Sequence, residues 1–242
     1  MTKLSMIVGF IVFFVLSFTI ISYIAAMGCS VRAVEVSNYE NKGDKALITV
    51  RIYIVNDAPV PAKINDIKLY IYDHGTFRGY DIGYVTVPAR HDKIIEYQVE
   101  VSASEVKDKI RLEVEWSYPL TVFFLYDLYN IETKYEVETS VLTGKYFIWA
   151  GWNTTYISSS KCTSYIVRTN PPTSFTLSIY KEIAGFGPRL INEIKGEGIL
   201  VDEFCPPEPS GLRTKGYFLE VRVEDVTWRQ PEGYPPRLYV RP

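Results

Sequence analysis

The sequence predicts an all-β protein attached to an N-terminal transmembrane helix. Residues 4–28 contain no charged side chain. The remaining chain holds many short segments in which apolar and polar residues alternate, which is the pattern of half-buried strands. Strands that alternate with long helices are not evident, and this argues against a parallel α/β fold.

The apolar segment from Leu4 to Gly28 is long enough to remain in a membrane. As a helix it measures about 37 Å at roughly 1.5 Å per residue, whereas a bilayer core of about 30 Å needs about 20 residues. The apolar part of a cleaved secretory signal is usually shorter, about 7–15 residues. We therefore expect a retained anchor in residues 1–29, with cleavage as the alternative.

The orientation of this anchor is only weakly encoded. Lys3 precedes the apolar segment and Arg32 follows it, so the difference in basic charge is small. A short N-terminal tail usually stays inside while the large C-terminal portion lies outside. We expect a cytoplasmic N-terminus and extracytoplasmic C-terminal domains.

Cys29 stands at the boundary of the anchor and offers a second way to reach a membrane. The run Ala26-Met27-Gly28-Cys29 resembles a lipobox, in which the cysteine is lipidated after cleavage. The small residue before Cys29 fits that motif, while Ala26 and Met27 match it poorly. The alternative is that Cys29 is a small apolar residue at the helix end.

Residues 30–142 predict an immunoglobulin-like or fibronectin-like antiparallel β-sandwich. Ile48, Val50 and Ile52 share one face at a period of two, with Thr49 and Arg51 on the other, as in a half-buried strand. About seven such segments are separated by turn residues every 8–12 positions, which is typical of a sandwich.

Part of this region resembles a known family. Asn56, Pro59 and Pro61 follow one strand, and Gly75, Gly79 and Pro88 punctuate the next segments. In this order they resemble the late embryogenesis abundant type 2 domain, also called the water-stress and hypersensitive-response domain, over about residues 31–140. The resemblance implies a β-sandwich, often behind a membrane anchor and without catalysis.

Residues 143–242 predict a second β-rich domain, either a β-sandwich or a jelly-roll-like module. Its clearest strand is Tyr217 to Val223. Cys162 and Cys205 are the only cysteines beyond the anchor, and we expect them to form a disulfide, with two separate buried thiols as the alternative. Such a bridge is worth roughly 4 kcal/mol in the chain-entropy model.

Two features near residue 150 are candidates for surface functions. Asn153-Thr154-Thr155 is an N-glycosylation sequon. Trp149, Trp152 and Tyr156 lie close together in sequence, and dense aromatic residues form binding surfaces for sugars or proteins. Core packing is the alternative explanation for these aromatic residues.

Several classes of function find no support in the composition. With 26 Lys and Arg against 28 Asp and Glu there is no basic excess for nucleic acid. Two histidines make a poor metal set, and neither a nucleophile elbow nor a phosphate loop is present. We expect no catalytic residue, metal or cofactor. Few glutamines beside many Glu and Lys residues favour a thermophilic source.

The sequence thus predicts a non-enzymatic, membrane-anchored extracytoplasmic protein that serves binding, adhesion or assembly of an envelope complex. Its expected partners are the bilayer, through Leu4 to Gly28, and another envelope protein or a surface glycan. Two alternatives stay open. One is an accessory subunit or module of an extracellular hydrolase, and the other is a pilus or filament subunit assembled by strand exchange.

Overall fold

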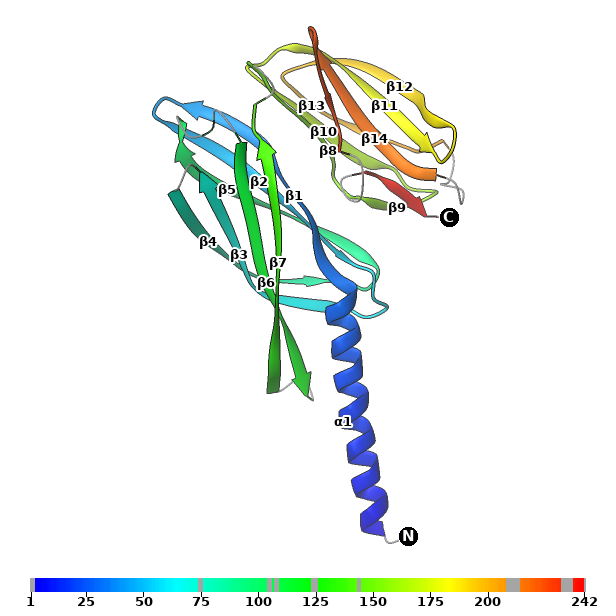
Figure 1. Ribbon diagram of the computed structural model, residues 1–242. Coiled ribbons are helices and arrows are strands. Elements are labelled where there is room, and N and C mark those ends of the chain that lie inside the picture. The colour runs from blue at the N-terminus through cyan, green and yellow to red at the C-terminus, as the bar shows by residue number, and fades with distance from the viewer. Residues whose placement is uncertain are drawn as a thin grey trace.

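The computed structural model describes residues 3–73, 76–103, 106, 109–122, 126–142, 145–207, 214–231 and 237–241. Helix α1 (Lys3–Gly28) leads directly into strand β1 (Cys29–Lys42), and in the described part of the chain fifteen further strands follow, β2 to β16. Figure 1 shows the helix extending from one end of two stacked β-sandwiches. The all-β fold behind an apolar helix is therefore confirmed.

Helix α1 is apolar on all sides. Two of its hydroxyl groups are satisfied within the helix: Ser17 Oγ donates to the Phe13 carbonyl and Thr19 Oγ1 to the Val15 carbonyl, each at 2.9 Å. The 23 residues from Met6 to Gly28 are long and apolar enough to cross a membrane. Length and composition make α1 suitable as either an anchor or a signal sequence.

The first sandwich contains seven strands in two antiparallel sheets. One sheet has the order β1-β2-β5 and the other β4-β3-β6-β7. After β1, the strands are β2 (Lys45–Asn56), β3 (Ala62–Asp73), β4 (Thr76–Val87), β5 (His91–Ser102), β6 (Lys109–Val122) and β7 (Tyr126–Ser140).

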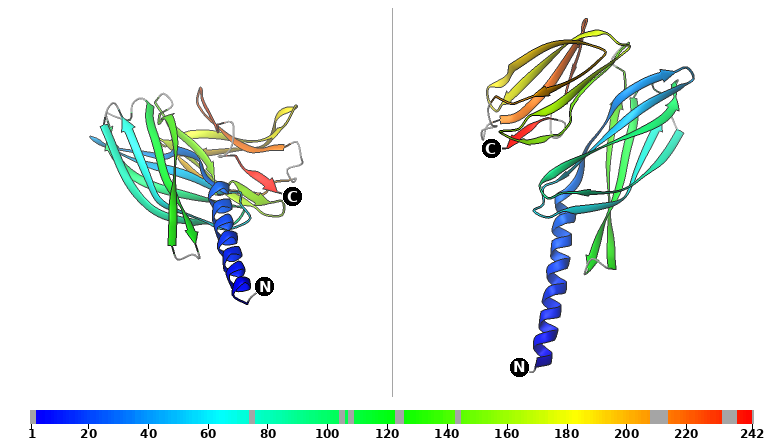
Figure 2. Two further views of the ribbon diagram at one scale, coloured as in Figure 1. Left: turned by 60° about the horizontal axis from the view of Figure 1, so that its bottom comes forward. Right: turned by 180° about the vertical axis from the view of Figure 1, so that it is seen from behind.

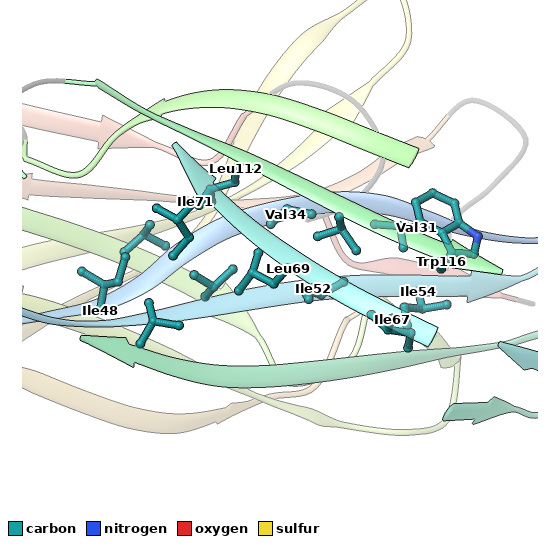
Figure 3. Packing of buried hydrophobic residues seen from close by; sticks show 14 of the residues in the cluster. Val31, Val34, Ile48, Ile52, Ile54, Ile67, Leu69, Ile71, Leu112 and Trp116 are labelled. Atoms are coloured by element: carbon teal, nitrogen blue, oxygen red, sulfur yellow. The ribbon is translucent and has the colours of Figure 1, made fainter. Parts of the chain in front are cut away.

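The core of this sandwich forms from the residues that the alternation predicts. Figure 3 shows Ile48 and Ile52 of β2 near Leu69 and Ile71 of β3, and none of these side chains is more than 3% exposed. The other face of β2 is buried as well: Thr49 is 4% exposed and Arg51 2%. The expectation of a half-buried strand was wrong for β2, because the second sandwich covers its outer face.

The second sandwich pairs a three-stranded sheet, β13-β10-β8, with a four-stranded sheet, β12-β11-β14-β15. A short parallel pair, β16-β9, lies beside them. The strands are β8 (Phe147–Trp152), β9 (Tyr156–Ser158), β10 (Thr163–Asn170), β11 (Ser174–Ile183), β12 (Gly187–Glu197), β13 (Ile199–Phe204), β14 (Thr214–Val223), β15 (Val226–Arg229) and β16 (Tyr239–Arg241).

A disulfide between Cys162 and Cys205 closes one end of this sandwich, which confirms the predicted pairing. Cys162 precedes β10 and Cys205 follows β13, and these two strands are hydrogen-bonded neighbours. The bridge spans 43 residues of sequence, so it removes much of the conformational freedom of the unfolded second domain.

Replacing both Cys162 and Cys205 with Ser should lower the free energy of unfolding of the second sandwich by about 2–4 kcal/mol. The physical reason is the loss of loop closure in the unfolded chain. Calorimetry of the full chain should show an earlier transition for the second sandwich, with the first little changed. An identical thermogram before and after the double substitution would contradict this assignment.

Candidate binding site at the junction of the two sandwiches

The two sandwiches meet through sheet β1-β2-β5 of the first and sheet β13-β10-β8 of the second. In each of these sheets, the face turned away from its own sandwich core forms the contact. Figures 1 and 2 show these sheets between the two outer ones. Phe147 of β8 lies near Tyr39 of β1, with ring centroids 6.3 Å apart. The segment after β8 reaches Asp92 of β5. Strand β8 and its continuation therefore cross the first sandwich from β1 to β5.

Strand β8 is buried on both faces, and every one of its residues is buried. Ile148, Ala150 and Trp152 pack in the core of the second sandwich. Phe147 and Trp149, on the opposite face, pack with the core residues of the first. A single strand thus contributes to two cores, which explains why the sequence of β8 is apolar throughout.

The predicted binding surface of Trp149, Trp152 and Tyr156 is wrong for both tryptophans. Trp149 is 2% exposed and Trp152 is fully buried, because they fill the two cores on either side of β8. Tyr156 is partly exposed and stacks on Tyr239, with centroids 5.6 Å apart. The aromatic residues pack the interior, as in the alternative explanation.

Trp149 is held between the sandwiches by two cations. The guanidinium of Arg51 lies 5.2 Å from its ring centroid and that of Arg168 lies 5.4 Å away, distances typical of cation–π contacts. Gly151 makes this approach possible. A Cβ at position 151 would lie 2.3 Å from the Trp149 ring and 2.8 Å from Arg51 Nη1.

Asp92 joins the first sandwich to the loop after β8. Its Oδ2 accepts hydrogen bonds from the Thr155 amide at 2.8 Å and the Thr155 hydroxyl at 2.7 Å. Its Oδ1 accepts one from the Thr154 hydroxyl at 3.1 Å. Both carboxylate oxygens are therefore engaged, and hydrogen bonds to an ionised group are the stronger kind.

Strand β10 adds two polar contacts to β1. Arg168 Nη1 donates to the Ser37 carbonyl at 2.9 Å, and Asn170 Nδ2 donates to the Tyr39 carbonyl at 2.5 Å. Burial lowers the pKa of Arg168, and the nearby Glu96 acts in the opposite direction. The junction therefore combines an apolar centre with polar contacts from β1 to β5.

Glu35 lies at the same junction and accepts a hydrogen bond of 2.5 Å from the Tyr53 hydroxyl. Burial raises the pKa of Glu35, while the Tyr53 hydrogen bond and the charge of Arg51 act to lower it. Burial is the largest of these effects, so the folded state favours the protonated acid.

A groove of about 480 Å³ opens at the edge of the junction. Arg51 lies at its base and is 2% exposed. Arg51 Nε and Nη1 make no hydrogen bond with the described residues, although Nε lies 3.5 Å from Glu96 Oε1. The groove is lined by Arg51, Asp92, Lys93, Ile94, Glu96, Asn153, Thr154 and Ile166.

The wall formed by β10 continues into an apolar strip on β13. Val201 pairs with Ile166, and Ile199 pairs with Arg168. Directly opposed residues of an antiparallel pair lie on the same face, so both side chains extend the wall of the groove. Val201 is 62% exposed and Ile199 is 68% exposed. This arrangement suits a ligand that accepts hydrogen bonds from Arg51 and places apolar groups along β13.

The sequence did not predict this groove. Its residues come from β2, β5, the loop after β8 and β10, and no local pattern connects them. Asn153 is exposed at its rim, whereas Thr155 of the same sequon is fully buried on Asp92. The hydroxyl of the sequon thus has a structural role in the junction, and glycosylation of Asn153 stays a prediction.

Cys29 lies where α1 becomes β1 and is 2% exposed. The Tyr118 hydroxyl donates to its carbonyl, and burial raises the pKa of its thiol to about 12. Cys29 is thus a buried residue at the helix end while α1 is present, and its lipidation after cleavage stays a prediction.

One group of side chains in the described ranges has the spacing of metal ligands: Cys162, Glu203 and Cys205. The two sulfur atoms are already bonded to each other, so neither is available as a thiolate ligand. This group does not fit a metal site.

Three larger proteins are among the solved structures that are partly similar to this chain. The TM-score is 0.42 for dimeric latent PorU from Porphyromonas gingivalis, at 11% identity over 88% of this chain. It is 0.24 for red sea bream transglutaminase, at 12% identity over 88%, and 0.28 for trypsin-activated alpha-2-macroglobulin from Escherichia coli, at 10% over 87%.

This chain spans 20%, 32% and 17% of those three proteins. The TM-scores are too low to support an argument about function. No protein-family model matches the sequence, and no curated protein is similar to it. The resemblance of residues 31–140 to the late embryogenesis abundant type 2 domain thus stays a prediction.

Replacing Asp92 with Ala should uncouple the sandwiches, because the Thr155 amide and hydroxyl lose their shared acceptor. We expect a loss of about 2–4 kcal/mol from the junction. Calorimetry should resolve two transitions, and X-ray scattering should give a larger radius of gyration. Asp81→Ala is the matched control, since the Asp81 side chain bonds only to Gly83 of its own strand β4. Unchanged scattering for Asp92→Ala would refute the role of this contact.

Replacing Glu35 with Gln should stabilise the folded chain at neutral pH. Because the folded state binds this proton more tightly, the contribution of Glu35 is fully present below its ordinary pKa of 4.5 and is lost as pH rises through the raised value. Thermal unfolding should thus show that the stability at pH 7, relative to the stability at pH 4, is higher for Glu35→Gln than for the exposed control Glu132→Gln. An equal pH dependence in the two variants is the opposing result.

Proposed function

We propose that this chain is a non-enzymatic, membrane-anchored extracytoplasmic protein that holds two β-sandwiches as one body for binding or assembly in the cell envelope. The observation that carries the proposal is the junction. Aromatic, cationic and carboxylate side chains connect the sandwiches from β1 to β5. Helix α1 passes into β1 without a linker. The direction of the anchor therefore sets the orientation of both sandwiches relative to the membrane.

In this proposal, the groove and the adjoining strip on β13 receive the partner. Arg51 offers donors at the base, and Val201 and Ile199 offer exposed apolar contact. Exposed apolar residues next to a polar groove mark interaction sites more often than scattered single residues do. Another envelope protein fits this combination better than a glycan, because the tryptophans expected to stack on sugars are buried.

Assembly through a sheet edge is a second candidate, and β12 and β13 favour it. Each is the edge strand of its sheet in the second sandwich. Leu190 on β12 is 48% exposed, and Ile199 and Val201 on β13 are more exposed. An edge strand with free backbone groups and apolar side chains is suited to accept a strand from another chain.

The hydrolase alternative is less well supported by the groove. The two carboxylates that line it are Asp92 and Glu96. Both oxygens of Asp92 are occupied by Thr154 and Thr155, and Glu96 lies beside Arg51. This arrangement leaves no free pair of carboxylates for acid–base catalysis.

The test uses the full chain in native membranes. We expect it to remain in the membrane pellet after alkaline washing, to begin before residue 28, and to be digested by external protease. A photo-crosslinking residue at Val201 should give one discrete adduct, whereas the same residue at Asp81, on β4, should give none. A soluble chain that begins after residue 28 would contradict the anchor. Absence of an adduct at Val201 would contradict the binding surface.

A further inference from the structure

The end of the hairpin formed by β6 and β7 extends beyond the rest of the first sandwich. Strand β3 pairs with β6 only as far as Ser117, which lies opposite Asn65. The ladder between β6 and β7 continues past that point to Val122 and Tyr126. The hairpin thus ends as a two-stranded ribbon, and Figures 1 and 2 show it pointing in the same direction as α1.

This ribbon reaches the level of the apolar helix. Tyr118 and Pro119 of β6 line a crevice of about 260 Å³, and its opposite wall is formed by Ile21, Ser22, Ala25 and Ala26 of α1. Three residues separate Pro119 from Val122, which is about 10 Å at roughly 3.3 Å per residue. The same distance corresponds to about seven residues of helix at roughly 1.5 Å each. The described end of the ribbon is therefore level with the C-terminal half of α1.

The sequence of β6 changes character where the ribbon leaves the sandwich, while β7 keeps one charged residue there, Asp127, opposite Thr121. Charged residues alternate with apolar ones along the paired part of β6, as in Arg111, Glu113 and Glu115, and β7 carries Glu132, Lys134 and Glu136. Residues 118–126 read YPLTVFFLY and contain no charge. Tyr118 is buried in the core of the first sandwich. The uncharged sequence continues beyond it into the part of the β6–β7 ladder that lies past the pairing of β6 with β3.

We propose that the described end of the β6–β7 ribbon, as far as Val122 and Tyr126, lies in the membrane leaflet beside α1 and forms a second, shallow contact with lipid. This inference depends on the proposal that α1 spans the membrane. A bilayer is the partner that fits this ribbon, because the ribbon runs beside α1, the one helix of the described residues that is long and apolar enough to cross a membrane. Tyr126 and Tyr129 of β7 are of a residue type that is enriched at membrane interfaces.

The depth of insertion is limited by the backbone. A two-stranded ribbon has two open edges, and unpaired N–H and C=O groups are costly in hydrocarbon. The ribbon therefore stops among the headgroups and the outermost acyl carbons. Helix α1 permits this position, since its 26 residues measure about 39 Å and exceed a core of about 30 Å by about 9 Å.

The crevice between α1 and the ribbon has a lining that fits the same level of the membrane. Lys63 and Asn65 contribute polar groups, while Ile21 and Ala25 contribute apolar ones. Lysine near a membrane boundary places its stem along apolar groups and its ammonium among headgroups. Lipid headgroups are the occupant that this mixture of side chains accepts.

The test places an environment-sensitive fluorophore on single cysteines of the full chain, reconstituted in vesicles of phosphatidylcholine with phosphatidylglycerol. The background carries Cys29→Ala and keeps the disulfide. Thr121→Cys and Val122→Cys report on the ribbon, since adjacent strand residues point to opposite faces. Thr133→Cys is the matched control on β7 within the sandwich, and Ser17→Cys reports on the anchor.

We expect blue-shifted emission from at least one ribbon probe relative to Thr133→Cys, with loss of quenching by aqueous iodide. Lipids with a shallow spin label should quench it more strongly than lipids with a deep one. Thermal unfolding of each variant checks that the sandwich is intact.

Three results would overturn the inference in different ways. If Ser17→Cys lies in lipid while both ribbon probes are as accessible to iodide as Thr133→Cys, the hairpin does not insert but the anchor stands. If the ribbon probes are shielded from both iodide and spin-labelled lipid, a protein surface covers the ribbon. If the Ser17 probe is also in water, the anchor itself is refuted.

Discussion

The contact between Trp149 and Arg51 determines how the two sandwiches meet. Trp149 projects from β8 into the outer face of β2, and Arg51 lies against its ring at 5.2 Å. Gly151 leaves the space that both side chains occupy. Once this contact is made, β8 has no solvent-facing side, and the neighbouring strand β10 is brought within hydrogen-bond distance of β1.

The polar contacts of this junction contribute more to its specific geometry than to its free energy of association. Removing a cation such as Arg51 from water costs several kcal/mol. Each cation–π contact returns about 0.5–2 kcal/mol, and each hydrogen bond to a charged group returns about 1.5–3 kcal/mol. These contributions nearly offset the cost, so the polar groups select one arrangement while the buried aromatic surface supplies most of the net stabilisation. Asp92 matters because it fixes the far end of the same interface.

The elements that the sequence predicted are those governed by local rules. The alternation in β2 identified Ile48, Val50 and Ile52 as core residues, and they are fully buried. The uncharged N-terminal run is a single helix, and Cys162 and Cys205 are bonded. Each of these predictions depends on a property of the sequence alone. The property is a period of two for β2, an uncharged apolar run for α1, and a single pair of cysteines beyond the anchor for the disulfide.

The elements that the sequence missed depend on contacts between distant segments. A period of two separates the faces of a strand, but it does not distinguish solvent from a second sheet on the polar face. Arg51 therefore had the pattern of an exposed residue, although Trp149 covers it. The tryptophans at 149 and 152 had the density of a binding surface, although they belong to two different cores. The groove required residues from four segments, and only the fold brings them together.

The direct passage from α1 into β1 also determines how the protein responds to mechanical tension. In the function proposed above, a pull between the membrane and a partner on the second sandwich would enter the first sandwich at Cys29, the first residue of β1. That strand is paired with β2 from Cys29 opposite Asn56 to Lys42 opposite Lys45. Force along β1 therefore loads the whole ladder in shear, with its hydrogen bonds sharing the load rather than opening one after another. An envelope protein attached in this way is suited to hold its partner under strain without unravelling from its anchored end.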